Sequence, residues 1–439
     1  MQTLTQLQNG ELSGAVSLKL SEGLTHFPKE IFELAETLEV LDLSHNKLSV
    51  LPADFGRLRK LRIFFGSDNL FTVLPEVLAD CPLLDIVGFK ANSIETIPAR
   101  ALNPNLRWLI LTDNCITELP KEIGSCSRMQ KLMLAGNHLS SLPQELSHCR
   151  NLSLLRISAN RLTHLPEWLL SMPKLSWLAF SGNVFSRTYT NNSLHVVSWQ
   201  ELEIHHKLGE GASGIIYKGL QQHAEGKKDV AIKVFKGAVT SDGLPEDELN
   251  AFIAAGAHTG LAQIIGQIAN HPEEKKGVVM ELIAERFYNL GLPPSFETCT
   301  RDVFTKGMSL SENQVLKIAG TIASVAHQLH SKGIMHGDLY AHNTLVDNEG
   351  NTLFGDFGAA SFYDKSETKT ALALERLEVS AFGCLLDDLL TLCADTQNTK
   401  TINKLYTLRD ACMASDVPLR PGFQYIDSEI TALQHLRLA

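Results

Sequence analysis

The sequence lacks the paired cysteine motifs of a disulfide-rich or zinc-binding protein. Its eight cysteines include no CxxC pair and no cysteine–histidine spacing suited to zinc, so we expect reduced thiols. The opening residues MQTLTQLQNGEL have neither the basic stretch nor the apolar core of a secretory signal. No apolar run reaches the roughly 18 residues that a membrane span needs. Together these absences predict a cytoplasmic protein with no membrane span.

An excess of positive charge is also missing. The chain has 39 Lys and Arg against 49 Asp and Glu, a net charge of -10 that is spread along its length, which argues against nucleic acid as a partner. With 439 residues, 44% of them hydrophobic, the chain is long enough for two or three globular domains of about 100 to 200 residues each.

The first half of the sequence is dominated by an internal repeat. Segments such as LEVLDLSHNKLSVLP and LRWLILTDNCITELP share one template, and its asparagine recurs every 22 or 23 residues. These asparagines are Asn46, Asn69, Asn92, Asn114, Asn137, Asn160 and Asn183. Over roughly residues 14–190 the pattern resembles the leucine-rich repeat family. The resemblance implies a solenoid in which leucines of short strands, such as Leu38, Leu41 and Leu43, point inward, while each asparagine binds backbone groups at a strand end.

Residues that alternate with the inward leucines should line the concave face of the solenoid. Many of them are apolar, and a contiguous exposed apolar patch usually marks a binding surface, although such residues also favour strands in general. We expect a protein partner or substrate there. The predicted contact residues are Val40, Ile63, Phe65, Ile86, Trp108, Ile110, Met133, Leu154 and Trp177.

The repeat stops after Asn183, and the polar stretch SRTYTNNSLHVVS follows. We therefore predict a repeat domain with a short connector at residues 1–196 and a second domain at residues 197–439.

The second domain opens with a glycine-rich motif. LGEGASGIIYKG places Gly209, Gly211 and Gly214 in a GxGxxG pattern. A dinucleotide-binding fold would need a helix after these glycines, but the β-branched residues that follow favour a hairpin. A glycine-rich hairpin lets backbone amides approach phosphate oxygens. Lys233 in VAIK lies 19 residues beyond Gly214, on the returning strand, within reach of such phosphates.

A lysine in that position needs a carboxylate to hold it. The helical stretch PEDELNAFIAAGAHTGL offers Glu246, Asp247 and Glu248. Glu248 sits on the face that should pack inward, whereas the other two are the acids that a helix dipole favours in a first turn. We therefore predict Glu248 as the partner.

A second motif lies further along, in IMHGDLYAHNTLVDNEGNTLFGDFG. His336, Asp338 and Asn343 match HxDxxxxN, and Asp356 heads DFG thirteen residues later. Phosphoryl transfer requires a residue that positions the acceptor hydroxyl, a task that suits Asp338. It also requires hard oxygen ligands for Mg²⁺, which Asn343 and Asp356 supply.

From about residue 200 to 439 the sequence resembles the eukaryotic-type protein kinases. The resemblance implies that the fold is multidomain α/β and α+β, a leucine-rich repeat solenoid followed by a two-lobed protein-kinase-like domain that uses ATP and Mg²⁺. It also implies that Arg420 pairs with a glutamate, for which Glu375 is the candidate. The implied nucleotide-binding residues are Gly209, Gly211, Gly214, Ile216, Ala231, Lys233, Met280, Glu281, Ile283 and Leu345.

The sequence departs from that family at several positions. Gly337 replaces an arginine that reads a phosphorylated activation loop, which predicts activity without such gating. Neither Tyr340 nor His342 supplies a dependable cation where the family carries lysine or arginine, so the choice of hydroxyl stays open. Only 22 residues separate Asp356 from Glu378, the counterpart of an aspartate in the family, so the peptide-docking segment looks short. Candidate autophosphorylation sites are Ser361, Tyr363, Ser366, Thr368 and Thr370.

Three functions fit these patterns, and the first is the one that we predict. The first is an ATP-dependent protein kinase whose repeats hold a substrate or partner near the catalytic site. The second is a pseudokinase scaffold that does not turn over. The third is a kinase of small molecules such as aminoglycosides, because HGDL also occurs on that related fold.

Overall fold

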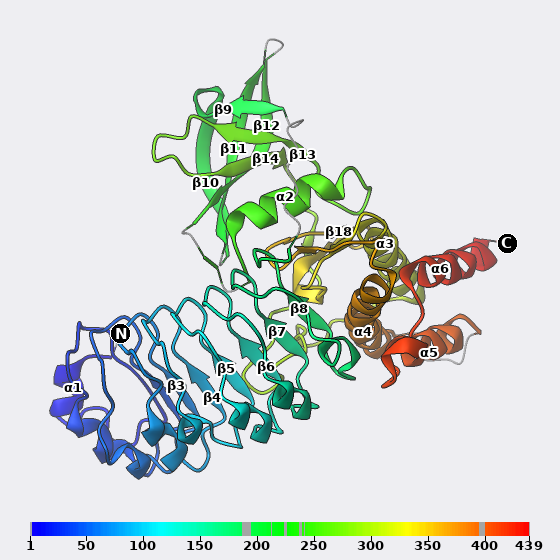
Figure 1. Ribbon diagram of the computed structural model, residues 1–439. Coiled ribbons are helices and arrows are strands. Elements are labelled where there is room, and N and C mark those ends of the chain that lie inside the picture. The colour runs from blue at the N-terminus through cyan, green and yellow to red at the C-terminus, as the bar shows by residue number, and fades with distance from the viewer. Residues whose placement is uncertain are drawn as a thin grey trace. The chain divides into compact units, whose positions relative to one another are not determined.

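Figure 1 shows the computed structural model of the protein. The structure describes residues 2–186, 195–211, 213–223, 226–236, 239–240, 242–394 and 400–438. The chain divides into two compact units. The first comprises Met1–Leu175 and Asn183–Phe185, and the second comprises Ser176–Gly182 and Ser186–Ala439. In the described part of the chain, no helix is long and apolar enough to cross a membrane.

The first unit is a solenoid of short parallel strands, each followed by a turn of 3-10 helix, after the initial helix α1 (Leu4–Gln8). Neighbouring strands pair in chain order without a shift in register. The strands are β1 (Ser17–Lys19), β2 (Val40–Asp42), β3 (Ile63–Phe65), β4 (Ile86–Gly88), β5 (Trp108–Ile110), β6 (Lys131–Met133) and β7 (Leu154–Arg156). The 3-10 helices are η1 (Lys29–Leu34), η2 (Phe55–Arg57), η3 (Glu76–Asp80), η4 (Ala99–Ala101), η5 (Lys121–Ser125), η6 (Gln144–His148) and η7 (Leu169–Ser171). The predicted repeat solenoid is confirmed.

The repeated asparagines bind backbone groups of successive turns, as expected. The Asn114 amide nitrogen donates to the carbonyls of Phe89 at 2.9 Å and Leu111 at 3.1 Å. Its amide oxygen accepts the N–H of Ile94 at 2.9 Å. Asn46, near the N-terminal end of the solenoid, makes equivalent bonds to the carbonyls of Leu20 and Leu43. Because these side chains are buried, each amide replaces backbone hydrogen bonds that the tight turns cannot make.

The interior of the solenoid is filled by leucines and by phenylalanine rings in edge-to-face contact. Leu38, Leu41 and Leu43 are fully buried, and the Phe55 and Phe64 rings meet with centroids 5.4 Å apart. These contacts link one repeat to the next, so no repeat can bury its apolar face alone.

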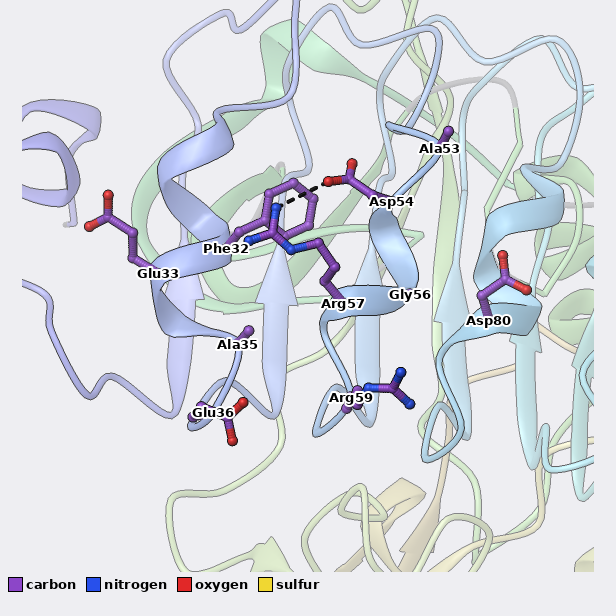
Figure 2. Close-up of a pocket in the computed structure, with 10 residues that line it drawn as sticks. All are labelled: Phe32, Glu33, Ala35, Glu36, Ala53, Asp54, Gly56, Arg57, Arg59 and Asp80. Carbon is purple, nitrogen blue, oxygen red and sulfur yellow. Dashed lines mark hydrogen bonds and ion pairs between the residues drawn. The ribbon is translucent and has the colours of Figure 1, made fainter.

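Outside this core the 3-10 helices form a charged recess, which Figure 2 shows in close-up. The Arg57 guanidinium lies 4.3 Å from the centre of the Phe32 ring and pairs with Asp54 at 3.1 Å. Both charged side chains are more than half exposed, so the pair adds little stability.

The expectation of a continuous exposed apolar column on the concave face is wrong. Ile63, Ile86, Leu154 and Trp177 are buried, with exposed fractions of 6%, 0%, 4% and 2%. One reason is that side chains in register on parallel strands pack along the column. For example, the Phe65 ring closes over Gly88, where a Cβ atom would meet it at 2.7 Å. The remaining predicted contact residues are half-buried, and these are Val40, Phe65, Trp108, Ile110 and Met133.

The second unit contains a strongly twisted sheet with the strand order β10-β11-β12-β14-β13-β9. Val230, Ile232 and Val279 lie at the centre of its apolar face. Helix α2 (Pro245–Ala255) packs on the same sheet through Leu249, which contacts Phe235 and Val278. The strands are β9 (Val196–Ser198), β10 (Leu202–Glu210), β11 (Gly214–His223), β12 (Gly226–Phe235), β13 (Ile264–Ala269) and β14 (Gly277–Glu281).

The rest of the second unit is mainly helical. Helix α3 (Glu312–Ser331) begins with a capping box between Ser311 and Gln314, and it packs against α6 (Phe423–Leu438). Helix α4 (Thr368–Leu392) is buried along most of its length and packs against α5 (Lys400–Cys412). Between α3 and α4 the chain forms short hairpins that carry the second sequence motif. These elements are β16 (Ile334–Met335), η9 (Ala341–Asn343), β17 (Thr344–Val346), β18 (Thr352–Phe354) and β19 (Ser361–Phe362). Strand β15 (Tyr288–Asn289) precedes α3 and pairs antiparallel with β17. The expected repeat solenoid followed by a kinase-like domain with a mixed sheet and helices is therefore confirmed.

One strand has an unexpected place. Strand β8 (Trp177–Ala179) carries the repeat pattern, but the segment Ser176–Gly182 that contains it belongs to the second unit. It packs on α4 (Figure 1), where the Ser176 hydroxyl donates to the Ser380 hydroxyl at 2.9 Å.

Candidate active site

The predicted hairpin follows the glycines, where β11 and β12 pair antiparallel with Ile216 opposite Lys233, and the glycine-rich motif itself forms a further hairpin before it. Strands β10 and β11 pair antiparallel, with Gly209 opposite Ile216, and the N–H of Gly211 donates to the carbonyl of Gly214 at 3.0 Å. A Cβ atom at Gly214 would lie 2.7 Å from the carbonyl oxygen of Val234, so only glycine fits there. At Gly209 and Gly211 a Cβ atom would meet nothing within 4 Å, which leaves their backbone open to a ligand.

This hairpin covers a cavity of about 480 Å³ within the second unit. Its walls are largely apolar, with a few charged groups at one end, which is the usual composition of a small-molecule site. Eleven residues predicted from the sequence line it: Gly209, Gly211, Gly214, Ile216, Lys233, Glu248, Met280, Ile283, Asn343, Leu345 and Asp356. Ala231, Glu281 and Asp338 are not part of the lining. Ala231 lies opposite Met280 in the sheet, and the Glu281 side chain is exposed and pairs with Lys228 at 3.3 Å.

Lys233 forms a buried ion pair with Glu248 of α2. The two side chains are 12% and 6% exposed, whereas Glu246 pairs with Lys276 at the surface. Burial acts to lower the pKa of Lys233, but the carboxylates of Glu248 and Asp356 outweigh it and raise the pKa. Lys233 therefore stays cationic at the charged end of the cavity.

Asp338 is held by the amide of Asn343. The Asn343 nitrogen donates to Asp338 Oδ2 at 2.7 Å and to the Asp338 carbonyl at 3.0 Å. Because the amide nitrogen is used in this way, the amide oxygen is the atom that can serve a cation. Asp356 has a positive φ of 57°, an uncommon conformation that is often found at functional sites.

A buried histidine forms hydrogen bonds with the backbone beside both Asp338 and Asp356. His336 is 1% exposed, and its ring stacks on Phe354 at a centroid distance of 4.1 Å. Burial lowers its pKa, so the ring is neutral. Its Nε2 lies 3.1 Å from the carbonyl of Gly355, and its Nδ1 accepts the N–H of Asp338 at 3.3 Å. This bonding assigns the proton to Nε2 and connects the residues that flank Asp338 and Asp356.

Glu378 of α4 anchors the same loop. Its carboxylate accepts the N–H of His336 at 3.1 Å and the N–H of Gly337 at 2.6 Å, and it lies 2.7 Å from Nε2 of His330. Glu378 is fully buried. Burial acts to raise its pKa, but His330 and the backbone donors outweigh it and hold the pKa below the ordinary value.

The structure corrects the interpretation of His342. The ring lines the cavity, and its Nδ1 lies 2.7 Å from Asp302. Burial acts to lower the pKa of His342, but Asp302 outweighs it and raises the pKa. His342 is therefore a better cation than the sequence suggested. Sequence reasoning missed Asp302, because its pairing with His342 spans 40 residues without a motif.

The expected pair between Arg420 and Glu375 is wrong in this structure. Arg420 donates to the carbonyls of Ala414 at 2.9 Å and Arg376 at 3.0 Å. Glu375 instead accepts the N–H of Phe423 at 2.7 Å, which fixes the start of α6.

Two of the five candidate phosphorylation sites are inaccessible. Ser361 is 0% exposed and Tyr363 is 9% exposed, and the Tyr363 hydroxyl lies 2.8 Å from Nδ1 of His330. Ser366 and Thr368 are exposed, and Thr370 is half-buried.

The groups around the cavity suit a magnesium-bound nucleotide. Asn343 and Asp356 present an amide oxygen and a carboxylate, which are hard donors of the kind that Mg²⁺ binds. Magnesium in nucleotide sites needs only one or two such protein ligands, because phosphates and water complete its shell. Lys233 supplies the positive charge opposite them, and the apolar walls near Met280 and Leu345 suit a base.

Comparison with protein families gives matches to both units. The model of the protein kinase domain matches residues 202–377. Models of leucine-rich repeats match residues 127–185 and 37–58.

Individual relatives cover parts of the chain. A probable serine/threonine-protein kinase of Dictyostelium discoideum is 30% identical over 194 residues, which are 44% of this chain and 10% of that protein. A probable cyclin-dependent serine/threonine-protein kinase of the same organism is 28% identical over 185 residues, 42% of this chain and 25% of that protein. The leucine-rich repeat and calponin homology domain-containing protein 1 of Mus musculus is 28% identical over 129 residues, 29% of this chain and 18% of that protein.

The chain thus spans a quarter or less of the length of these relatives. The family matches and the arrangement of residues around the cavity agree on the architecture of this chain. It combines leucine-rich repeats with a protein kinase domain.

Proposed function

We propose that the protein is an ATP- and magnesium-dependent protein kinase that transfers the γ-phosphate to protein hydroxyls, preferring serine and threonine to tyrosine. The observation that carries the proposal is the convergence of Lys233, Asn343 and Asp356 on one cavity, with Asp338 held by Asn343. The preference for serine and threonine is supported by the relatives, which are named as serine/threonine-protein kinases.

In this proposal each side chain has a defined task. Lys233, kept cationic by Glu248, orients the phosphates of the nucleotide. Asn343 and Asp356 hold Mg²⁺, which when bound neutralises charge on the transferred group. Asp338 orients the acceptor hydroxyl and accepts its proton, and the bond from Asn343 fixes the carboxylate in place.

The test of this proposal measures phosphate transfer by the full chain and compares the wild type with the Asp338→Asn variant. The substitution keeps the size of the side chain and removes its charge, so nucleotide binding should persist while labelling of casein and autophosphorylation fall by at least about 100-fold. Phosphosite mapping then identifies the acceptor residue. Nucleotide binding without transfer by the wild type would favour a pseudokinase scaffold, and transfer to aminoglycosides without protein labelling would favour a small-molecule kinase.

We further propose that the repeats bind a protein partner or substrate. A bound substrate gains effective concentration at the catalytic site, which compensates for a short docking segment. The predicted contact residues that a partner can still reach are the half-buried Val40, Phe65, Trp108, Ile110 and Met133.

Ile110→Arg in the full chain should reduce labelling of selected proteins in a cell lysate and leave casein labelling unchanged. Val50→Arg is the matched control, because Val50 is 67% exposed and lies outside the predicted contact residues. Equal lysate labelling by both variants and the wild type would refute the role of this face. A cytoplasmic location stays a prediction from the sequence.

A further inference from the structure

The segment Ser176–Gly182 lies between the regular repeats and the connector in sequence, yet it packs inside the second unit. Its residues Trp177 and Phe180 are 2% and 0% exposed. None of its positions was predicted to take part in catalysis, and Trp177 was predicted only to contact a protein partner.

The segment first meets the loop that carries Asp338. The Trp177 indole Nε1 donates to the carbonyl of Leu339 at 3.0 Å. Its ring lies flat on Tyr340, with centroids 4.5 Å apart and an interplanar angle of 3°. Leu339 and Tyr340 are the two residues that follow Asp338, so Trp177 fixes the backbone directly beside the catalytic carboxylate.

The segment next meets the strand that follows Asp356. The N–H groups of Phe180 and Ser181 both donate to the Ser361 hydroxyl, at 2.9 Å and 3.1 Å. Ser361 lies in β19, which pairs with β16 just before the loop of Asp338. One buried hydroxyl thus ties the segment to a strand that follows Asp356 and that pairs with the strand preceding Asp338.

One further contact completes the set. The Ser176 hydroxyl donates to Ser380 of α4, two residues from Glu378, which binds the same loop.

The segment also explains Gly337. This glycine has a φ of 74°, and a Cβ atom on it would lie 2.7 Å from the carbonyl oxygens of Leu178 and Ala359. The carbonyl of Leu178 belongs to the segment. Any side chain at residue 337, including the arginine typical of the family, would therefore collide with it.

We propose that Ser176–Gly182 is a positioning element of the phosphotransferase site, with Trp177 and the hydroxyl of Ser361 as its main contacts. It acts on the reaction through the loop of Asp338 and the strand after Asp356. Its Leu178 carbonyl occupies the space that an arginine side chain at position 337 would need. The proposal rests on the proposed kinase function for its kinetic consequence, but not for its structural one.

The kinetic test compares Trp177→Phe with the wild type in the full chain. Phenylalanine keeps a ring against Tyr340 and removes the N–H donor to Leu339. Loss of one buried hydrogen bond should lower kcat roughly five- to tenfold and leave the KM for ATP unchanged, because Trp177 does not line the cavity. Trp177→Ala, which also loses the stack, should lower kcat further. Trp168→Phe is the matched control, since Trp168 lies in the repeats and should leave kcat as it is.

A second readout is independent of activity. In Trp177→Ala, amide hydrogen exchange should accelerate in peptides that cover residues 335–343 and 359–363, and it should not change there in Trp168→Phe. Unchanged kcat and unchanged exchange in both Trp177 variants would overturn the proposal. If the wild type transfers no phosphate, the proposed function fails, and the exchange experiment alone decides whether the segment positions this loop.

Discussion

The buried pair of Lys233 and Glu248 provides the sharpest quantitative prediction. Lys233→Met removes the cation and leaves the Glu248 carboxylate, 6% exposed, without its partner. Breaking a buried ion pair from one side costs about 3–5 kcal/mol, a large part of the roughly 5–15 kcal/mol that stabilises a typical domain. We therefore expect urea denaturation of the second unit to shift to clearly lower concentration.

The double variant Lys233→Met with Glu248→Met separates stability from function. Replacing both charges with apolar side chains of similar length is often neutral or stabilising, so the free energy of unfolding should return to within about 1 kcal/mol of the wild type. Nucleotide affinity should stay low in both variants, because the cation that meets the phosphates is absent.

Lys228→Met is the matched control for this cycle. Lys228 pairs with Glu281 at 3.3 Å, but both side chains are more than half exposed, so its removal should change stability little. A double variant that is as unstable as Lys233→Met alone would refute the reasoning, since the cost would then not arise from an uncompensated carboxylate.

Three further predictions follow from the geometry. Gly337→Ala should cost about 1–3 kcal/mol in unfolding free energy through its positive φ alone, and kinase labelling should also fall because the added Cβ atom collides with two carbonyls; wild-type behaviour would contradict this. The pKa of Glu378 is held below its ordinary value. Its ionised carboxylate therefore stabilises the folded protein fully at a pH above the ordinary pKa, and this stabilisation is lost as the pH falls through the lowered pKa. The difference in stability between the wild type and Glu378→Gln should thus shrink below about pH 4 in acid denaturation. Asn114→Ala should destabilise the repeats by at least about 2 kcal/mol, because it leaves buried backbone groups unpaired, as urea unfolding of the full chain would show.

Much of the fold could be predicted because its signals are local and repeated. The asparagine spacing of 22 or 23 residues specifies a solenoid, since a side chain that bonds the preceding turn must recur once per turn. The β-branched residues after Gly214 likewise predicted the hairpin. Both rest on interactions between residues that are close in sequence or separated by one constant period.

The parts that were missed depend on partners far apart in sequence. Trp177 follows the repeat pattern as well as Trp108 does, yet Trp108 contacts its neighbours in the solenoid, whereas Trp177 bonds to Leu339, 162 residues away. The pattern determines that such a side chain leaves the strand on the concave side. It does not determine which surface meets the side chain there.

Gly337 departs from the family pattern, and the departure has a steric explanation. Taken alone, the loss of an arginine beside the catalytic aspartate suggests a weakened or ungated enzyme. The space that its side chain would need is instead filled by the carbonyls of Leu178 and Ala359, and the adjoining Trp177 binds the residue after Asp338. An arginine that binds a phosphorylated residue positions the loop of Asp338 only after phosphorylation. Hydrogen bonds from a segment of the same chain position that loop whenever the chain is folded. On this argument the glycine is a steric requirement of the segment, and restoring the arginine should abolish labelling rather than confer regulation by phosphorylation.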